Sequence, residues 1–249
     1  MTRKSPMTLS GEAPHPCGHC AFYQDSVWQP VEQSGVSTLA RSFSRRELDE
    51  GEVLFEQGAE SGGVYCVSRG LIALRSYQSD GKSTLLKLAY PGEIIGFRSF
   101  LDDGPHRTEA RALVASRVCI VARRDAKRVV RANPSVLARL ASRCIAEIDR
   151  SHERIIASAT LSNKVRLTEI LLQLARHHGA RLEGYVEMKL PLSRPDLADL
   201  IGVQPETLSR LVKRLEREGE FLFSGRRVKI AETVFDEDGG FGPPIAKRA

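Results

Sequence analysis

Between residues 52 and 122, short apolar runs alternate with turn signals. The runs at 64–67 and 71–74 are each only four residues long, and a glycine separates them. Asp80-Gly81 is a favourable hairpin turn, because glycine adopts the positive φ that such turns require. Closely spaced short strands of this kind are typical of an antiparallel barrel or roll.

A second apolar pattern, with steps of three and four residues, begins at Asn133 and Pro134. Asparagine is a good N-cap and proline suits the first helical position, so we expect a helix to begin there. No helix breaker follows until after Ser162, so the predicted helix is long for a small domain. Such a stripe usually pairs with a second copy, which predicts a homodimer, and packing within the same chain is the alternative. The stripe consists of Leu137, Leu140, Cys144, Ile148 and Ile155.

The strand-rich half of the chain precedes a helix-rich half, which predicts an α+β protein with two domains joined by the long helix. Outside the roll strands, the pattern predicts a short helix from about 36 to 48, an amphipathic helix at 164–178 and a strand at 187–190. The predicted regions are a flexible N-terminus with a Cys-x-x-Cys segment (1–35), a β-roll domain (36–130), the long helix (131–160), a helical C-terminal domain (161–235) and a flexible tail (236–249).

Residues 192–218 have the pattern of two short helices joined by a tight turn. Ser193 is a suitable N-cap for the first helix, Gly202 ends it, and Pro205 begins the second helix. Ala198 is a small residue four positions before Gly202, which allows the two helices to cross closely. The segment therefore predicts a helix-turn-helix.

The outward face of the second predicted helix has the chemistry of a recognition helix. Arg210 can donate two hydrogen bonds to guanine, Glu206 can accept one from cytosine, and Ser209 can bond a base or a phosphate. Lys213 and Arg214 lie one turn further along, where they can meet the DNA backbone. The simpler alternative is an ordinary helix pair with a charged solvent face. The outward set is Glu206, Thr207, Ser209, Arg210, Lys213 and Arg214.

A basic hairpin after this helix favours DNA binding over that alternative. Arg226 and Arg227 follow the turn signal Ser224-Gly225, in the position of a wing that contacts phosphate. The net charge of +6, from 37 basic and 31 acidic residues, permits a nucleic-acid partner without requiring one. The small residue with its glycine turn, the polar triplet and the basic hairpin together predict double-stranded DNA as the partner.

Other function classes find little support in the sequence. It contains no nucleophile elbow, P-loop or paired catalytic carboxylates, so we do not expect an enzyme. No apolar run reaches the length of about 18 residues that a membrane span needs, so we expect no membrane partner. The basic residues at the start are not followed by an apolar core of a signal peptide, and we expect a cytoplasmic protein.

The chain contains the segments GEVLFEQG (51–58), VYCVSRG (64–70), PGEIIG (91–96) and ETLSR (206–210). Together they resemble the CRP/FNR family of bacterial transcription regulators, in its FNR- and FixK-like branch, over residues 40–232. The resemblance implies a sensory β-roll of the cyclic-nucleotide-binding type, a dimerisation helix and a winged helix-turn-helix. It also implies that Glu206, Ser209 and Arg210 read a TTGAT half-site repeated as a palindrome. RNA polymerase is the implied partner of an activator of this family.

Five cysteines in a chain without an export signal argue against a disulfide scaffold. FNR-like oxygen sensors bind an iron–sulfur cluster through N-terminal cysteines and one cysteine of the roll. Cys17 and Cys20 resemble the first group, and Cys119 resembles the cysteine of the roll. The resemblance therefore implies an oxygen-responsive cluster, of the 4Fe–4S type, on soft thiolate ligands.

One ligand of that family pattern is missing, because no third cysteine follows Cys20 in the N-terminal region. Cys66 is our candidate for the fourth ligand, since it lies in a predicted strand of the same roll. A small buried apolar residue is the equally weighted alternative for Cys66, and Asp25 and His19 are further ligand candidates. Cys144 lies on the apolar stripe and is interpreted as a packing residue.

A regulator of the same fold without an iron–sulfur cluster remains open as a second interpretation. The Cys-x-x-Cys segment can hold zinc with His15 or His19, or cycle between dithiol and disulfide, and a small ligand can replace the metal. We do not expect a cyclic nucleotide, because Phe97 stands where the family's ribose-binding glutamate would follow Gly96. Arg107-Thr108 can hold a phosphate but is interpreted as structural.

Overall fold

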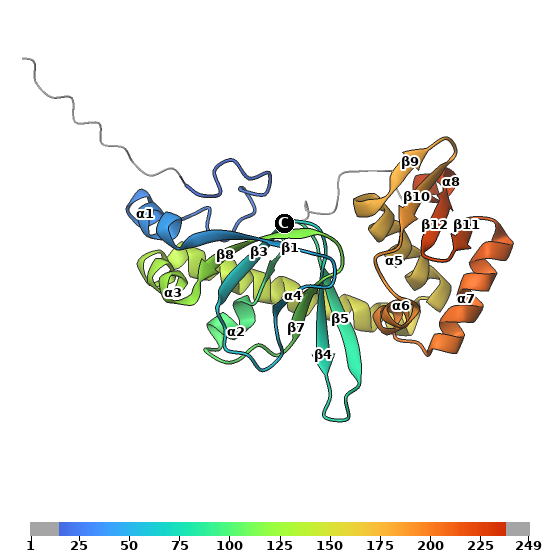
Figure 1. Cartoon of the computed structure of the whole chain (residues 1–249), viewed down its shortest axis with the longest axis horizontal. Helices are drawn as coiled ribbons and strands as arrows, with labels where there is room; N and C mark the ends of the chain where they lie inside the picture. Colours follow the sequence, from blue (N-terminus) through green and yellow to red (C-terminus); the bar gives the residue numbers. More distant parts are fainter. Residues whose placement is uncertain (1–14, 238–249) are drawn as a thin grey trace, which may run out of the picture.

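The computed structural model describes residues 15–237, and its N-terminal half contains the predicted antiparallel β-roll (Figure 1). Two four-stranded sheets form the roll, with strand orders β1-β8-β3-β6 and β2-β7-β4-β5. The first sheet consists of β1 (Phe43–Leu48), β8 (Ser116–Ala122), β3 (Gly63–Arg69) and β6 (Ile94–Ile95). The second consists of β2 (Val53–Phe55), β7 (Glu109–Ala112), β4 (Ile72–Tyr77) and β5 (Ser83–Ala89).

A shared apolar core joins the two sheets of the roll. Val67 and Val118 of the first sheet and Ile72 of the second are completely buried in one cluster. The predicted Asp80-Gly81 turn is confirmed, since Gly81 has a φ of 82° and connects β4 to β5. These observations confirm the fold that the short apolar runs predict.

Three short helices cover the outside of the roll: α1 (Gln33–Ser42), α2 (Phe97–Leu101) and α3 (Arg123–Ala132). The predicted helix over 36–48 is wrong in its second half, because α1 ends at Ser42 and the next residues form β1. β1 pairs with β8 along its whole length, from Phe43 opposite Val121 onward. Only Leu48 is buried within β1, so the pairing partner rather than the local apolar pattern decides the strand.

The long helix is α4 (Pro134–Thr160), and its length of 27 residues agrees with the prediction. The predicted side-chain cap is wrong, because Asn133 makes no capping hydrogen bond to α4. Its amide group instead accepts from the Glu32 backbone N–H at 2.9 Å and donates to the Val129 carbonyl at 2.8 Å. Asn133 therefore ties α3 to the segment that precedes α1, and proline alone marks the start of α4.

The part of the N-terminal region that the structure describes is packed, which corrects the prediction of a flexible segment over 1–35. Residues 15–31 form consecutive turns, and Trp28 is only 2% exposed in an apolar cluster with α1, α3 and α4. The buried indole anchors this segment, because removing so large an apolar surface from water is strongly favourable. Residues 1–14 and 238–249 of the predicted flexible ends lie outside the described residues.

The C-terminal domain begins with α5 (Asn163–His178) and contains a four-stranded sheet ordered β11-β12-β10-β9. The elements of this domain after α5 are β9 (Ala180–Leu182), β10 (Tyr185–Lys189), α6 (Arg194–Ile201), α7 (Pro205–Glu218), β11 (Phe221–Ser224), β12 (Arg227–Ala231) and α8 (Glu232–Glu237). Its core continues into the roll, since Leu71 and Leu85 belong to the same buried cluster as Leu171 and Leu197. Within residues 15–237, no helix is long and apolar enough to cross a membrane.

Candidate nucleic-acid interface and cysteine cluster

The helix-turn-helix has the local geometry that the sequence predicts. Ser193 and Asp196 form a capping box at the start of α6, in which each side chain accepts from the other residue's backbone N–H. Gly202 ends α6 in the left-handed conformation, with a φ of 67° that glycine adopts easily. Pro205 then begins α7, so the turn between the helices comprises three residues.

The apolar residues on the inner face of α7 are buried, and this fixes which side chains face outward. Leu208 and Leu215 are completely buried and Val212 is nearly so, in the cluster that also holds α5 and α6. The outward set is exposed except for Thr207, which is half-buried. The structure therefore brings together on one surface Glu206, Ser209, Arg210, Lys213 and Arg214.

The outward side chains differ in how far they are already engaged. Arg214 forms an ion pair with Glu218 at 3.0 Å, and the Ser209 hydroxyl donates to the Pro205 carbonyl at 3.0 Å. Within residues 15–237, Arg210 and Lys213 have no ion-pair partner for their side chains. Arg210 and Lys213 are consequently the cations most available to an incoming nucleic acid.

The basic hairpin is present as β11 and β12, joined at Gly225 with a φ of 59°. Both of its arginines also have partners within the protein. The Arg226 guanidinium donates to the Leu190 carbonyl at 3.2 Å and lies 3.9 Å from the Glu50 carboxylate of the roll. Arg227 lies 3.9 Å from Glu187 of β10. Phosphate contact by this hairpin would therefore compete with weak ion pairs, which cost little to exchange.

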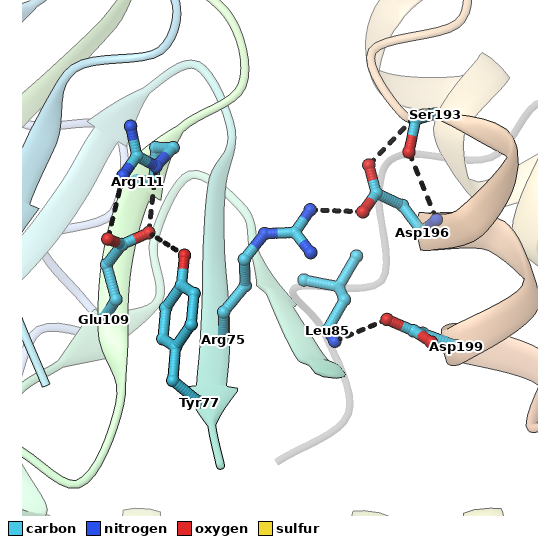
Figure 2. Close-up of polar contacts among 8 residues, drawn as sticks. All are labelled: Arg75, Tyr77, Leu85, Glu109, Arg111, Ser193, Asp196 and Asp199. Carbon is cyan, nitrogen blue, oxygen red and sulfur yellow. Dashed lines mark hydrogen bonds and ion pairs between the residues drawn. The ribbon is translucent and has the colours of Figure 1, made fainter. Parts of the chain in front are cut away.

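Helix α6 packs against the roll by way of two carboxylates (Figure 2). Arg75 of β4 forms a hydrogen-bonded ion pair with Asp196, and both side chains are largely buried. Burial alone would favour the neutral acid, but hydrogen bonds from Arg75 and Ser193 keep the pKa of Asp196 below its ordinary value. Asp199, one turn further along, accepts from the Leu85 backbone N–H of β5 at 2.9 Å. The roll therefore holds the first helix of the helix-turn-helix.

Four of the five cysteines come together on one side of the roll, and the fifth, Cys144 of α4, packs against the same apolar cluster. Cys66 of β3 stands directly opposite Cys119 of β8 in the antiparallel ladder, so their side chains are on the same face. Cys17 and Cys20 belong to the packed N-terminal segment, and they share an apolar cluster with Cys66. All four thiols are free.

The environment of Cys17 and Cys66 favours the protonated form of these two thiols. Burial, with smaller contributions from Cys119 and Cys20, raises the pKa of Cys17 to about 11. Burial, followed by the influence of Cys119 and Cys17, also raises the pKa of Cys66. The thiols therefore lie within electrostatic range of one another, and charging several of them together requires a compensating cation.

The four cysteines have the donor chemistry of a thiolate-bound metal cofactor. Their side chains are not yet arranged as a complete set of metal ligands. Among the described residues, no three His, Cys, Asp or Glu side chains are arranged to hold a metal ion as they stand. His15 is engaged structurally, because its Nδ1 accepts from the Cys17 backbone N–H and its Nε2 then donates to the Trp28 carbonyl at 2.9 Å. This leaves His15 with no lone pair for zinc.

Two arginines of α4 bind the backbone of the cysteine-bearing segment. Arg139 donates to the carbonyls of Gln24 and Ser26, both at 2.9 Å, and Arg143 donates to the carbonyl of Asp25 at 2.5 Å. Arg139 also donates to the Gln29 side chain at 2.8 Å. The long helix is thereby connected to the segment that carries Cys17 and Cys20.

The outer part of α4 carries an apolar stripe that the described chain leaves uncovered. Ile145, Ile148, Ile155 and Ile156 are between 54% and 65% exposed, and Leu137 is 46% exposed. Leu140, by contrast, is completely buried against the roll. Packing within the chain therefore covers only part of the predicted stripe, and several large apolar side chains exposed along one helix are typical of an interface.

Two protein families match this architecture in the observed order. A cyclic nucleotide-binding domain matches residues 45–133, and a Crp-like helix-turn-helix domain matches residues 165–232. The chain belongs to the CRP/FNR family. It is a DNA-binding transcription regulator of that family, with the β-roll, long helix and winged helix-turn-helix that the sequence predicts.

Individual relatives match most of the chain. It is 28% identical to the transcriptional regulatory protein btr of Bordetella pertussis, over 93% of this chain and 95% of that protein. It is 24% identical to the anaerobic regulatory protein of Pasteurella multocida, over 88% of this chain and 80% of that protein. The structure of FixK2 from Bradyrhizobium japonicum superposes with a TM-score of 0.62 at 25% identity, covering 76% of this chain and 92% of that chain.

Two residues on which the expectation of no cyclic nucleotide rests make contacts within the roll of this CRP/FNR protein. Phe97 is only 2% exposed and packs into the apolar cluster beneath α3 and α4. The Arg107 side chain is exposed and forms an ion pair with Asp102 at 2.7 Å, and its structural role stays a prediction. The expectation that no cyclic nucleotide binds stays a prediction.

Several residues that matter for this CRP/FNR arrangement are missed by the sequence analysis. Arg139 and Arg143 are four positions apart, which marks them as neighbours on one helix face, but nothing local identifies the carbonyls that they bind. Asp196 is recognisable as a capping residue, whereas its partner Arg75 is 121 positions away. Such pairs become visible only in the folded chain.

Proposed function

We propose that this regulator acts as a homodimer whose DNA binding depends on an iron–sulfur cluster held by Cys17, Cys20, Cys66 and Cys119. The observation that carries the proposal is the pairing of Cys66 with Cys119 on the face toward the N-terminal cysteines. The name of the anaerobic regulatory protein of Pasteurella multocida supports a link to oxygen.

The four cysteines supply a donor set suited to iron. Thiolates are soft, charged ligands, and four of them match the usual ligation of a 4Fe–4S cluster. When bound, the cluster would make the protein responsive to oxygen or nitric oxide, because either molecule can destroy it. Cys66 would take the place of the N-terminal cysteine that this chain lacks, because it stands directly opposite Cys119 in the ladder of β3 and β8.

The chain's own residues would carry the signal to the long helix. Arg139 and Arg143 hold the backbone at 24–26 against α4, so the position of Cys17 and Cys20 is coupled to that helix. A change in this segment would shift α4 against the roll. The exposed isoleucine stripe of α4 would pair with its copy, because burying apolar surface is the main favourable contribution to such an interface.

Each protomer would present α7 to one half-site of a TTGAT-type palindrome. Arg210 would read guanine, Glu206 would accept from cytosine and Ser209 would contact a neighbouring base or phosphate. Binding of two half-sites by one dimer multiplies the specificity, so loss of the dimer would remove specific binding. RNA polymerase is the expected protein partner if the regulator acts as an activator.

Metal analysis of protein purified without air tests the cluster. We expect a brown protein with iron and acid-labile sulfide, and loss of both in Cys66→Ser. Cys144→Ser is the matched control, because Cys144 lies on α4 and is expected to pack only, so this variant should keep its iron. A colourless wild-type protein without iron would reject the cluster in favour of thiol redox, zinc or a small ligand.

The dimer is tested separately by substitution on the exposed stripe. Ile148→Glu should produce monomers in analytical ultracentrifugation, since it places a charge in the proposed apolar interface. Leu222→Glu is the control, because Leu222 is 59% exposed on β11, away from α4. A wild-type protein that is monomeric with its full metal content would overturn the dimer and leave the metal site standing.

A further inference from the structure

One arginine of the roll stands in the same cross-strand row as two of the four cysteines. Arg45 of β1 lies directly opposite Cys119 of β8, which lies directly opposite Cys66 of β3. Side chains that are directly opposite in antiparallel strands point to the same face, with their Cβ atoms about 5 Å apart. The row therefore places a permanent positive charge one strand away from Cys119 and two strands away from Cys66.

The guanidinium of Arg45 stays on the face of the sheet that carries the cysteines. Its Cζ atom lies 5.5 Å from the centre of the Phe43 ring, in a cation–π contact. Phe43 is two residues earlier on β1 and thus on the same face, and its ring packs against the apolar cluster that contains Cys17, Cys20 and Cys66. The contact with Phe43 therefore keeps the charge of Arg45 beside the cysteines.

Arg45 differs from two neighbouring arginines of this sheet because no carboxylate neutralises it. Arg46 forms an ion pair with Glu52 at 2.6 Å, and Arg117 forms one with Glu47. Arg45 has no ion-pair partner in the part of the chain that the structure describes. Its charge is consequently available to the thiols.

The charge of Arg45 also reaches the N-terminal cysteines. Burial is the largest influence on the pKa of Cys17 and raises it, whereas Arg45 acts in the opposite direction. Arg143 of α4 acts in this way on Cys66, but its guanidinium already binds the Asp25 carbonyl. A cation that opposes the effect of burial favours the thiolate, which is the form that binds metals.

We propose that Arg45 is a positioning residue of the cysteine site, whose charge offsets part of the negative charge of the thiolates when they hold a metal. Four thiolates carry more negative charge than a divalent cation neutralises, and an uncompensated charge in partly buried surroundings is costly. Arg45 would reduce this cost without touching the metal. The inference rests on the proposed function, because it requires that the four cysteines bind metal together.

Cobalt(II) binding to the metal-free full chain under argon tests the role of Arg45. Thiolates bind divalent transition metals, and the thiolate–cobalt bond absorbs near-ultraviolet light, so a titration gives the affinity without any assay of regulation. Arg45→Gln should weaken cobalt binding about two- to fivefold at low salt, as expected for a partly exposed charge. Arg45→Glu should weaken it by about the square of that factor, whereas Arg45→Lys should restore it.

Salt dependence separates the charge of Arg45 from a merely structural role. At about 1 M salt the screening length falls to about 3 Å, so wild type and Arg45→Gln should bind cobalt nearly equally. Arg46→Gln is the matched control, because it removes the same charge from the next residue. Arg46 stands opposite Val118 and hence on the other face of the sheet, so its variant should stay within about 1.5-fold of wild type.

The outcomes distinguish this inference from the proposed function. Wild-type protein that contains no iron after anaerobic purification would reject the iron–sulfur cluster, and a charge-dependent cobalt series in the same protein would still support the role of Arg45. Equal cobalt affinity of wild type and Arg45→Gln at low salt would overturn that role. A loss that persists unchanged at about 1 M salt, or the absence of a thiolate–cobalt band, would overturn it as well.

Discussion

The two helices of the helix-turn-helix are held differently. Helix α6 packs on the roll through Asp196 and Asp199, with Arg75 and the Leu85 backbone as their partners (Figure 2). Helix α7 packs through its apolar inner face, and within residues 15–237 its outer charges include an arginine without an ion-pair partner, Arg210. The roll can therefore move α6, while α7 keeps its surface free for DNA.

Because of this difference, α6 determines where the helix-turn-helix lies, whereas α7 determines its expected sequence specificity. The two helices share one apolar cluster, so a displacement of α6 carries α7 with it. Under the proposed function, the bases that are read depend on the side chains of α7. Substitutions in α6 and α7 should accordingly affect different measurements.

The largest effect is expected from a substitution in the apolar core that connects the two helices. Leu208→Ala should lower the free energy of unfolding by about 2–5 kcal/mol, because this fully buried side chain leaves a cavity in the shared core. Denaturant unfolding measures the change. Leu222→Ala is the same substitution at a site 59% exposed, and should cost no more than about 0.5 kcal/mol. Equal losses in the two variants would mean that α7 is not anchored through Leu208.

The next effect concerns the α6 side of the comparison. Asp196→Asn keeps an oxygen for the capping box but removes the charge that pairs with Arg75. We expect a loss of about 1–3 kcal/mol in the free energy of unfolding, since the Arg75 side chain is largely buried. Asp199→Asn is the control, because its oxygen can still accept from the Leu85 N–H.

The pH dependence of the Asp196 variant gives an independent check. The folded-state pKa of Asp196 is lowered, so the stabilisation is present above the unfolded-state pKa and is lost as the pH falls through the folded-state pKa. The difference between wild type and Asp196→Asn should be constant above roughly pH 5 and shrink below about pH 4. A difference that persists unchanged in acid would show that the ion pair contributes nothing.

A comparable effect on binding, without an effect on stability, is expected for α7. Arg210→Ala should cost about 1–3 kcal/mol of discrimination at one base pair, measured by filter binding to TTGAT palindromes and single-base variants. Its unfolding free energy should stay within about 0.5 kcal/mol of wild type, because the side chain is exposed. Arg124→Ala, which removes an exposed charge from α3, should bind like wild type. Equal loss on all sequences would assign Arg210 to phosphate instead.

The smallest effect distinguishes two neighbouring cations of α7. Lys213→Ala should reduce the slope of binding affinity against salt concentration by about one. Arg214→Ala should change the slope less, because Arg214 already pairs with Glu218. A larger change for Arg214 would show that this ion pair is exchanged completely for phosphate.

Much of the helix-turn-helix is predictable from sequence because its determinants are local. A capping serine, a left-handed glycine and a first-position proline each act within one turn of backbone, at Ser193, Gly202 and Pro205. The positions of β3 and β4 and the length of α4 follow likewise from apolar periodicity, although both strands are longer than the four-residue runs that mark them. The exposure of Arg210 follows from the same 3.6-residue repeat that buries Leu208.

The sequence by itself determined the fold class, the order of the domains and the chemistry of the α7 surface, because those depend on neighbours along the chain. The tertiary structure alone decided that residues 43–48 form a strand, that Asn133 binds Glu32, and that Cys66 faces Cys119. Each of these pairs residues that are far apart in the chain. Which distant partners meet depends on the packing of the whole core, and no local pattern contains that information.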